Sequence, residues 1–221
     1  MTREEVRAQI ETIGVIPSIR SSSREDAVFA AEAVASGGIP IVEVTMTVEG
    51  ALEVIDELAR VHPEIVVGAG TVLDVETARR CLDAGACFVT SPGFDPEIVE
   101  FALKQGIVTF PGALTPSEVM LAWKAGSDFV KVFPCAQLGG PDYIKTLKAP
   151  FPQIPLIATG GVNQQTVGPS IHAGAVAVGV GASLIHPRAI AKRERQWIIE
   201  LANRYRHLVS TARSQLREPS K

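Results

Sequence analysis

The sequence predicts an α/β fold: a single (β/α)8 TIM barrel over residues 1–221, with an N-terminal helix and a long C-terminal helix. Eight short β-rich apolar segments alternate with amphipathic segments and recur at about the length of one βα unit. No linker-like stretch divides the 221 residues, and 46% of them are apolar, which is enough for one sizeable core. These observations indicate one domain in which strands and helices alternate.

Eight segments have the length and composition of buried strands. The segments at 87–91 and 175–180 are apolar on both faces, which is typical of a parallel strand between a barrel core and outer helices. No GxGxxG motif follows the first segment, so a closed barrel is favoured over an open dinucleotide-binding sheet. The predicted strands are 15–19, 41–44, 65–69, 87–91, 107–110, 129–133, 155–159 and 175–180.

Helix boundaries are marked by capping residues between these strands. Asp95-Pro96 and Thr115-Pro116 each place a capping side chain before a proline at the first helical position, and Glu118 completes a capping box. Glycines at 85, 106 and 126 end three of the helices. The predicted helices are 24–36, 48–61, 74–84, 95–105, 115–125, 141–148, 164–173 and 188–216.

Composition excludes several classes of protein. The three cysteines and four histidines lack the spacing of a zinc site or a disulfide framework, so we expect neither a metal nor an organic cofactor. No apolar run reaches the roughly 18 residues of a membrane span. The N-terminus has no signal-peptide pattern, so we expect a cytoplasmic protein without a membrane partner.

The net charge of −3 does not indicate a polyanion-binding protein, but the C-terminal segment is basic. A nucleic-acid site is one interpretation of it, and the solvated face of a helix is the favoured one. We therefore expect no nucleic-acid partner. The charged residues concerned are Arg188, Lys192, Arg193, Arg195, Arg204, Arg206, Arg213, Arg217 and Lys221, with Glu194, Glu200 and Glu218.

Polar residues gather where the predicted strands end. The active sites of barrel enzymes lie at the C-terminal ends of the strands, so these residues are expected at one mouth. The convergence of these residues is stronger evidence for an active site than any single motif. The polar residues are Arg20, Glu43, Thr45, Thr47, Thr71, Ser91, Lys131, Thr159 and Ser183, and Pro92 follows Ser91 at the end of the fourth strand.

Lys131 and Glu43 are the most informative of them, because each interrupts an apolar strand. An ammonium among apolar neighbours loses hydration, which favours the neutral amine that can attack a carbonyl carbon. A buried carboxylate is costly unless it is paired or used in proton transfer. Two alternatives stay open for these residues: a lysine that extends from a strand end to water, and a structural salt bridge inside the barrel.

The segments Thr159-Gly160-Gly161 and 179–183 follow the last two predicted strands. Backbone N–H groups in such loops form the usual phosphate site of barrel enzymes, and glycine allows the backbone to approach an anion closely. Gly181 and Ser183 belong to the second loop. Tight turns without a ligand are the alternative interpretation.

These segments together resemble the 2-keto-3-deoxy-6-phosphogluconate (KDPG) aldolase / 4-hydroxy-2-oxoglutarate (KHG) aldolase family. The resemblance extends from position 13 to about position 185. It implies a (β/α)8 barrel, usually a homotrimer, with class I aldolase activity on a sugar-phosphate or 2-keto acid substrate in the Entner–Doudoroff pathway. The matching segments are VIPSIR, GGIPIVEVTMT, VGAGTVL, SPG, PGALTPSEVM, KVFP, GPDYIKTLKAPFP, ATGGV and VGVGASL.

The resemblance assigns roles to the mouth residues. Lys131 of KVFP matches the lysine that forms the Schiff base, and Glu43 of VEVT matches the general acid–base residue, which works through a water. Thr71 and Pro92 match residues around the pyruvate carboxylate and carbonyl. Phe133 matches the aromatic residue packed by the lysine.

The phosphate positions of the family correspond to Gly160, Gly161 and Ser183. One departure concerns the substrate's negative charge: many members have arginine where this chain has Thr47. Arg20 resembles an arginine that other members carry after the first strand. We therefore expect Arg20 to contact the substrate carboxylate or phosphate.

The resemblance implies a carbon–carbon lyase that cleaves KDPG to pyruvate and glyceraldehyde 3-phosphate, or KHG to pyruvate and glyoxylate, or both. Two other classes share parts of this pattern. A non-covalent phosphosugar isomerase or epimerase has the phosphate loops but needs no lysine in an apolar strand. A catalytically silent sugar-phosphate-binding barrel has no reason to keep two buried charges.

Overall fold

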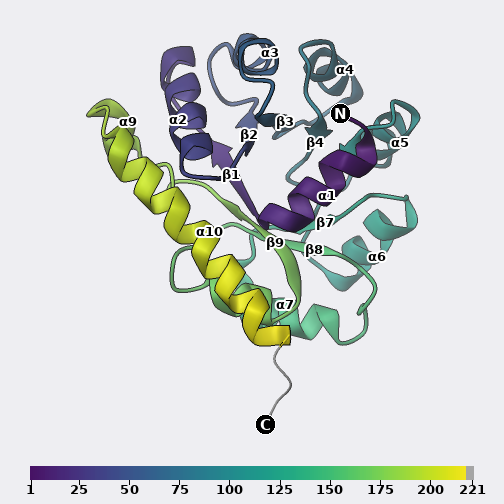
Figure 1. The fold of residues 1–221 in the computed structure, drawn as a ribbon. Coiled ribbons are helices and arrows are strands. Elements are labelled where there is room, and N and C mark those ends of the chain that lie inside the picture. Colours follow the sequence, from purple (N-terminus) through teal and green to yellow (C-terminus); the bar gives the residue numbers. More distant parts are fainter. Residues whose placement is uncertain (218–221) are drawn as a thin grey trace.

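The computed structural model describes residues 1–217 and is a parallel barrel surrounded by helices (Figure 1). Every strand pair is parallel, and the order in the sheet is β5-β4-β3-β2-β1-β9-β8-β7-β6. The strands in the described part of the chain are β1 (Val15–Ile19), β2 (Ile41–Thr45), β3 (Val66–Gly70), β4 (Phe88–Val89), β5 (Val108–Thr109), β6 (Gly112–Ala113), β7 (Val130–Val132), β8 (Leu156–Thr159) and β9 (Ala175–Val180). The predicted barrel is confirmed.

The fifth predicted strand, 107–110, contains β5, and a second short strand that was not predicted, β6, follows it at Gly112–Ala113. β5 pairs with β4 and β6 pairs with β7, so the two strands together close the barrel. Pro111 separates them, and its carbonyl accepts a hydrogen bond from Lys131 N at 3.0 Å. Proline has no N–H to donate, which accounts for the interruption. The nine short strands therefore occupy the eight predicted wall positions.

The helices lie outside this wall, as Figure 1 shows for α2 to α7. Most predicted helices are present, two with the predicted bounds and the others with ends shifted by at most three residues. The helices in the described part of the chain are α1 (Arg3–Ile13), α2 (Arg24–Ser36), α3 (Ala51–Val61), α4 (Val75–Asp83), α5 (Pro96–Lys104), α6 (Pro116–Lys124), α7 (Pro141–Lys148), α8 (Val167–His172), α9 (Pro187–Ala191) and α10 (Arg195–Arg217), with a short 3-10 turn at Ala136–Leu138.

The prediction of one helix over 188–216 is wrong, because α9 ends at Ala191 and α10 begins at Arg195. Arg193 has a φ of 54°, which breaks the helical path. Its guanidinium forms an ion pair with Asp26 at 3.0 Å and lies 4.9 Å from the ring centre of Phe29. Contacts with α2 thus hold the chain in a turn that helical periodicity does not reveal.

Two helices begin three residues later than predicted. The helix expected from position 48 begins at Ala51, after a turn in which Val48 N donates to Thr45 O, and Gly50 at φ 68° precedes it. The helix expected from position 164 begins at Val167. The Asn163 side chain accepts hydrogen bonds from the backbone N–H groups of residues 165 and 166, and this Asx turn occupies the predicted first turn.

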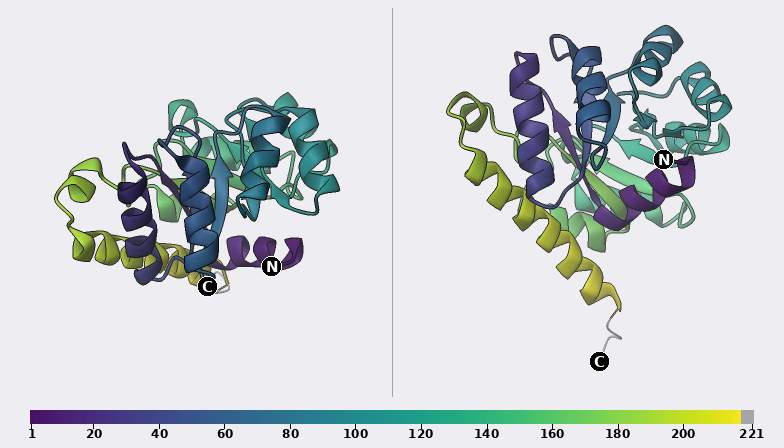
Figure 2. Two further views of the ribbon diagram at one scale, coloured as in Figure 1. Left: turned by 90° about the horizontal axis from the view of Figure 1, so that it is seen from above. Right: turned by 45° about the horizontal axis from the view of Figure 1, so that its top comes forward.

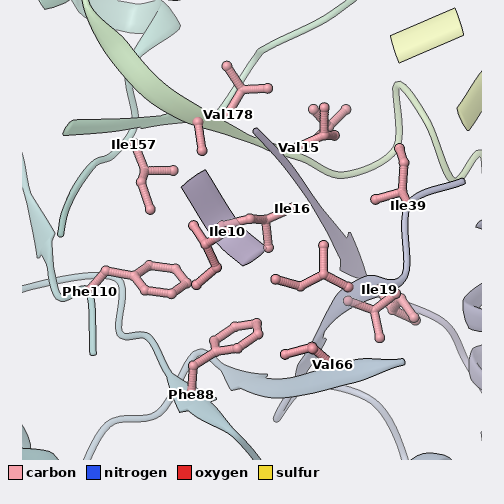
Figure 3. Close-up of a cluster of buried hydrophobic side chains, with 14 of the residues drawn as sticks. Ile10, Val15, Ile16, Ile19, Ile39, Val66, Phe88, Phe110, Ile157 and Val178 are labelled. Carbon is pink, nitrogen blue, oxygen red and sulfur yellow. The ribbon is translucent and has the colours of Figure 1, made fainter. Parts of the chain in front are cut away.

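The base of the barrel is covered by α1 and α10, which lie on one side of it in the left view of Figure 2. Val6 and Ile10 of α1 are fully buried. Figure 3 draws Ile10 with Phe88 and Phe110 in the core, and the two rings are 5.2 Å apart. The base of the barrel is therefore closed by packed apolar side chains.

The basic C-terminal segment is largely this covering helix. Arg195 pairs with Glu32 at 3.0 Å, and Arg213 donates to the carbonyls of Thr12 and Val176. These contacts support the structural interpretation over a nucleic-acid site. Glu218 and Lys221 lie outside the described residues. Within residues 1–217, no helix combines the length and apolarity needed to cross a membrane.

Candidate active site

All predicted site residues lie at the C-terminal mouth of the barrel or on the strands that lead to it. Glu43 and Lys131 are within β2 and β7, and Thr159 is the last residue of β8. The others follow a strand by one to three residues. These are Arg20 after β1, Thr47 after β2, Thr71 after β3, Pro92 after β4, Phe133 after β7, Gly160 and Gly161 after β8, and Gly181 and Ser183 after β9.

Glu43 is 2% exposed and is held between the two neighbouring strands. Ser18 is its register partner on β1, and the Ser18 hydroxyl donates to Glu43 Oε2 at 3.0 Å. On the other side, a Cβ atom at Gly70 would lie 2.0 Å from Glu43 Oε1, so only glycine leaves space for the carboxylate there. The β-sheet thus provides both a donor and a gap for this side chain.

Lys131 is 4% exposed and reaches the same lumen from β7. Its Nζ lies 3.7 Å from Glu43 Oε1 and 5.6 Å from the ring centre of Phe133. The first distance is within ion-pair range but beyond a normal hydrogen bond. Burial excludes the alternative of a lysine that extends to water. A lysine and a carboxylate therefore face each other inside the barrel.

Glu43 Oε1 has no hydrogen-bond partner among the described residues. A buried carboxylate oxygen without a partner is costly, and such atoms are found where function requires them. Oε1 is also the oxygen that faces Lys131. The arrangement leaves one carboxylate oxygen available to accept a proton near the lysine, which argues against a purely structural salt bridge.

Thr71, directly after β3, has a φ of 58°. A β-branched residue in this region is strained, and strain of this kind clusters at active sites. Pro92 belongs to the loop after β4 and lies close to the neighbouring strand β6, because a Cβ at Gly112 would be 2.1 Å from the Pro92 carbonyl oxygen. Both loops are held in specific positions at the mouth.

Thr47 and Arg20 lie at neighbouring strand ends and are exposed. The Thr47 hydroxyl is 2.7 Å from that of Thr45, which in turn donates to Ile19 O at 3.0 Å. Thr47 is therefore held in place, and Arg20 is exposed directly after β1. This placement is compatible with the predicted contact between Arg20 and an anionic substrate.

Gly160 and Gly161 have φ values of 90° and 81°. A Cβ at Gly161 would lie 2.3 Å from Ala136 Cβ, and one at Gly160 would lie 3.1 Å from Phe133. Close packing therefore requires these glycines whether or not an anion binds. A Cβ at Gly179 would be 2.5 Å from the Thr159 hydroxyl, so that glycine leaves room for the threonine.

Two residues of the site were not among the predicted site residues. Ser18 was treated only as part of a strand, although a serine inside VIPSI is a polar interruption like those of Glu43 and Lys131. Gly70 is part of the VGAGTVL segment, and no role in the site was predicted for it. Among the described residues, no group of three or more His, Cys, Asp and Glu side chains could hold a metal ion.

A parallel barrel whose mouth holds a buried lysine beside a carboxylate has the architecture of a class I aldolase. Comparison with known proteins gives the particular family. The KDPG and KHG aldolase family model matches residues 6–201, and the chain belongs to that family. The aldolase prediction is thus confirmed over the non-covalent isomerase and the silent barrel.

Individual relatives agree with this assignment. The chain is 34% identical over 194 residues to the 2-dehydro-3-deoxy-phosphogluconate aldolase of Pseudomonas aeruginosa, covering 86% of this chain and 88% of the relative. It is 36% identical over 149 residues to the KHG/KDPG aldolase of Escherichia coli, covering 67% and 70%.

Solved structures match over nearly the whole chain. KDPG aldolase of Legionella pneumophila, with pyruvate captured as a covalent carbinolamine intermediate, has a TM-score of 0.81 and 32% identity, covering 89% of this chain and 96% of that one. The Zymomonas mobilis enzyme with 3-phosphoglycerate has a TM-score of 0.82 and 28% identity, covering 93% and 97%.

Proposed function

We propose that Lys131 forms a Schiff base with a 2-keto acid and that Glu43 transfers the protons of the reaction. The observation that carries this proposal is the buried pair itself, with Lys131 Nζ 3.7 Å from an otherwise unpartnered Glu43 Oε1. A covalent carbinolamine of pyruvate in the related Legionella enzyme supports it.

The proposed substrates are KDPG, KHG or both. The names of the relatives in Pseudomonas aeruginosa and Escherichia coli support both substrates. KDPG would give pyruvate and glyceraldehyde 3-phosphate, and KHG would give pyruvate and glyoxylate. The first reaction would place the enzyme in the Entner–Doudoroff pathway.

The proposed cycle begins when neutral Lys131 Nζ attacks the C2 carbonyl, and loss of water from the carbinolamine gives an iminium. The iminium accepts the electron pair of the C3–C4 bond as that bond breaks, while Glu43 accepts the C4 hydroxyl proton through a water. The aldehyde product leaves. The remaining enamine takes a proton at C3, and hydrolysis releases pyruvate and free Lys131.

The remaining mouth residues are proposed to bind the substrate. Thr71, Pro92 and Phe133 would surround the pyruvyl portion, with Arg20 and Thr47 at the rim. A distal phosphate would be bound by the loops after β8 and β9. The residues assigned to it are Thr159, Gly160, Gly161, Gly181 and Ser183.

The broader organisation is also a proposal. Residues 1–221 would form one catalytic domain, the active molecule would be a homotrimer, and the enzyme would act in the cytoplasm without an organic or metal cofactor. Membership in the KDPG and KHG aldolase family supports this description. Light scattering of the purified protein measures the oligomeric state directly.

Borohydride reduction in the presence of pyruvate tests the Schiff base. Peptide mass spectrometry should find a reduced pyruvyl adduct on Lys131, and Lys131→Ala should abolish it. Lys148→Ala is the matched control, because Lys148 is a partly buried lysine, hydrogen-bonded to the carbonyls of Pro152 and Ile154, and burial lowers its pKa. An adduct on Lys148 but not on Lys131 would contradict the assignment.

Arg20→Ala tests the cationic contact. It should raise KM for the anionic substrate with a smaller effect on kcat, because Arg20 lies at the rim and not beside Lys131. Arg24→Ala removes a nearby exposed arginine that pairs with Glu57 at 2.6 Å, so it serves as the control. Unchanged KM and kcat in Arg20→Ala would refute this contact.

A further inference from the structure

The hydroxyl of Ser18 is the one side-chain donor bound to Glu43 among the described residues. It lies 3.0 Å from Glu43 Oε2, and Ser18 is 7% exposed. The two residues are register partners on β1 and β2, so the backbone pairing of the two strands sets their relation. The contact is thus a fixed feature of the barrel wall.

The two oxygens of Glu43 have different surroundings. Oε2 accepts the Ser18 hydrogen bond, whereas Oε1 lies over the space left by Gly70 and faces Lys131 Nζ at 3.7 Å. We propose that Ser18 is a positioning residue that fixes the Glu43 carboxylate, so that Oε1 is the atom that transfers protons. This inference rests on the proposed roles of Lys131 and Glu43.

The terminal torsion of a glutamate side chain has only broad preferences, so its carboxylate orientation depends on its hydrogen bonds. Without the Ser18 hydroxyl, Oε2 loses its partner in a buried setting. The carboxylate can then rotate and present both oxygens to Lys131. That rotation strengthens the ion pair and takes Oε1 away from the substrate, which slows proton transfer but leaves the lysine in place.

The proton step can be measured separately from Schiff-base formation. With pyruvate in D2O, the Lys131 iminium loses a C3 proton to Glu43, and the C–H electron pair forms the C2=C3 bond of the enamine. Return of a deuteron to C3 and hydrolysis give deuterated pyruvate. NMR follows this methyl exchange, while borohydride trapping reports on Lys131 alone.

Four variants test the proposal. Ser18→Ala and Ser18→Val should each slow the exchange about tenfold, a typical effect of losing one hydrogen bond to a charged group. Ser18→Thr, which has the shape of valine but keeps a hydroxyl, should retain most of the rate. Ser127→Ala is the matched control, since it removes another buried serine hydroxyl, bonded to Ala122 O at 2.8 Å, remote from the site.

The expected result is slower exchange with normal trapping in the alanine and valine variants, and normal exchange in the threonine variant. Normal exchange in Ser18→Ala, or an equal fall of exchange and trapping, would overturn the positioning role. If the unmodified protein showed neither adduct nor exchange, the proposed function itself would be wrong, and this inference with it.

Discussion

Among residues 1–217, two carboxylates are buried, one near each end of the barrel, and they are held in opposite ways. At the base, both oxygens of Asp128 have partners: Oδ1 accepts from Arg3 at 2.9 Å, and Oδ2 accepts from the Thr109 backbone N–H at 2.9 Å. Near the mouth, Glu43 has Ser18 on one oxygen and no hydrogen bond on the other. The two side chains are equally buried, at 3% and 2% exposed.

This difference distinguishes a structural carboxylate from a chemical one. Asp128 connects α1 to the start of β7, and its charge is balanced and fully hydrogen-bonded, as stability requires. Glu43 keeps a free oxygen beside a lysine, which stability alone does not explain. Neutralising each carboxylate in turn should therefore affect different properties of the protein.

The largest expected effect is that of Glu43→Gln on turnover. The amide keeps the size of the side chain and can still accept from Ser18, but it cannot accept a proton. We expect kcat to fall by about 10²–10⁴-fold, the usual contribution of general acid–base catalysis. The unfolding free energy should change less than in the Asp128 variant below. Steady-state kinetics and urea unfolding measure the two quantities, and wild-type turnover would remove Glu43 from the mechanism.

The matched change at the base, Asp128→Asn, should have the opposite profile. It weakens the charge-assisted bonds from Arg3, and we expect a loss of about 1.5–3 kcal/mol in urea unfolding. Turnover of the folded protein should remain within about twofold of the wild-type value, because Asp128 lies away from the mouth.

An exposed ion pair on α1, the helix that contains Arg3, provides the control for the loss of stability in Asp128→Asn. Glu11 pairs with Arg7 at 3.2 Å and is about half exposed, so Glu11→Ala should change stability by less than about 1 kcal/mol. Equal losses in the Asp128 and Glu11 variants would mean that burial of the Arg3–Asp128 pair contributes nothing to the stability of the base.

The sequence predicts the role of Glu43 but not that of Asp128. Glu43 and Lys131 are recognisable because each is a charge within an apolar strand. Asp128 comes just before a strand, where an acidic residue is ordinary, and its partner Arg3 is 125 residues away in sequence. Its role depends on a tertiary contact that no local pattern contains.

The fold shows the same division between features set by local sequence patterns, which can be predicted, and features set by tertiary contacts, which cannot. Alternating apolar segments predict all eight wall positions, because strand periodicity and buried composition are local properties. The break between α9 and α10 was not predicted, because Arg193 is held by Asp26 and Phe29 of a distant helix. Ser18 was missed for a related reason: only the pairing of β1 with β2 places its hydroxyl on Glu43.

Alkaline pH tests the mouth side of the molecule without a mutation at either carboxylate. Burial raises the pKa of the Cys135 thiol, just beyond β7, from 9.0 to about 11. Between these two pH values the thiol keeps its proton in the folded state and releases it in the unfolded chain. The stabilisation that comes from burying the neutral thiol is therefore complete below pH 9 and is lost as the pH rises to 11. Urea unfolding of Cys135→Ala should show a shallower decline over this interval than the wild type, and identical declines would contradict the shift.

The smallest expected effect concerns the second contact between α1 and the start of β7. The guanidinium of Arg7 lies 5.5 Å from the ring centre of Phe129, and the Phe129 and Phe110 rings form a T-shaped pair with centres 6.2 Å apart. Arg7→Ala should cost about 0.5–1 kcal/mol in urea unfolding, the usual size of a partly exposed cation–π contact. Arg7→Lys should recover part of this loss, because it keeps a positive charge. The Glu11→Ala variant corrects for the exposed ion pair that Arg7→Ala also removes. A reduction of kcat in Arg7→Ala, with stability unchanged, would show instead that the base acts on Lys131 through β7, and the division between a structural base and a chemical mouth would fail.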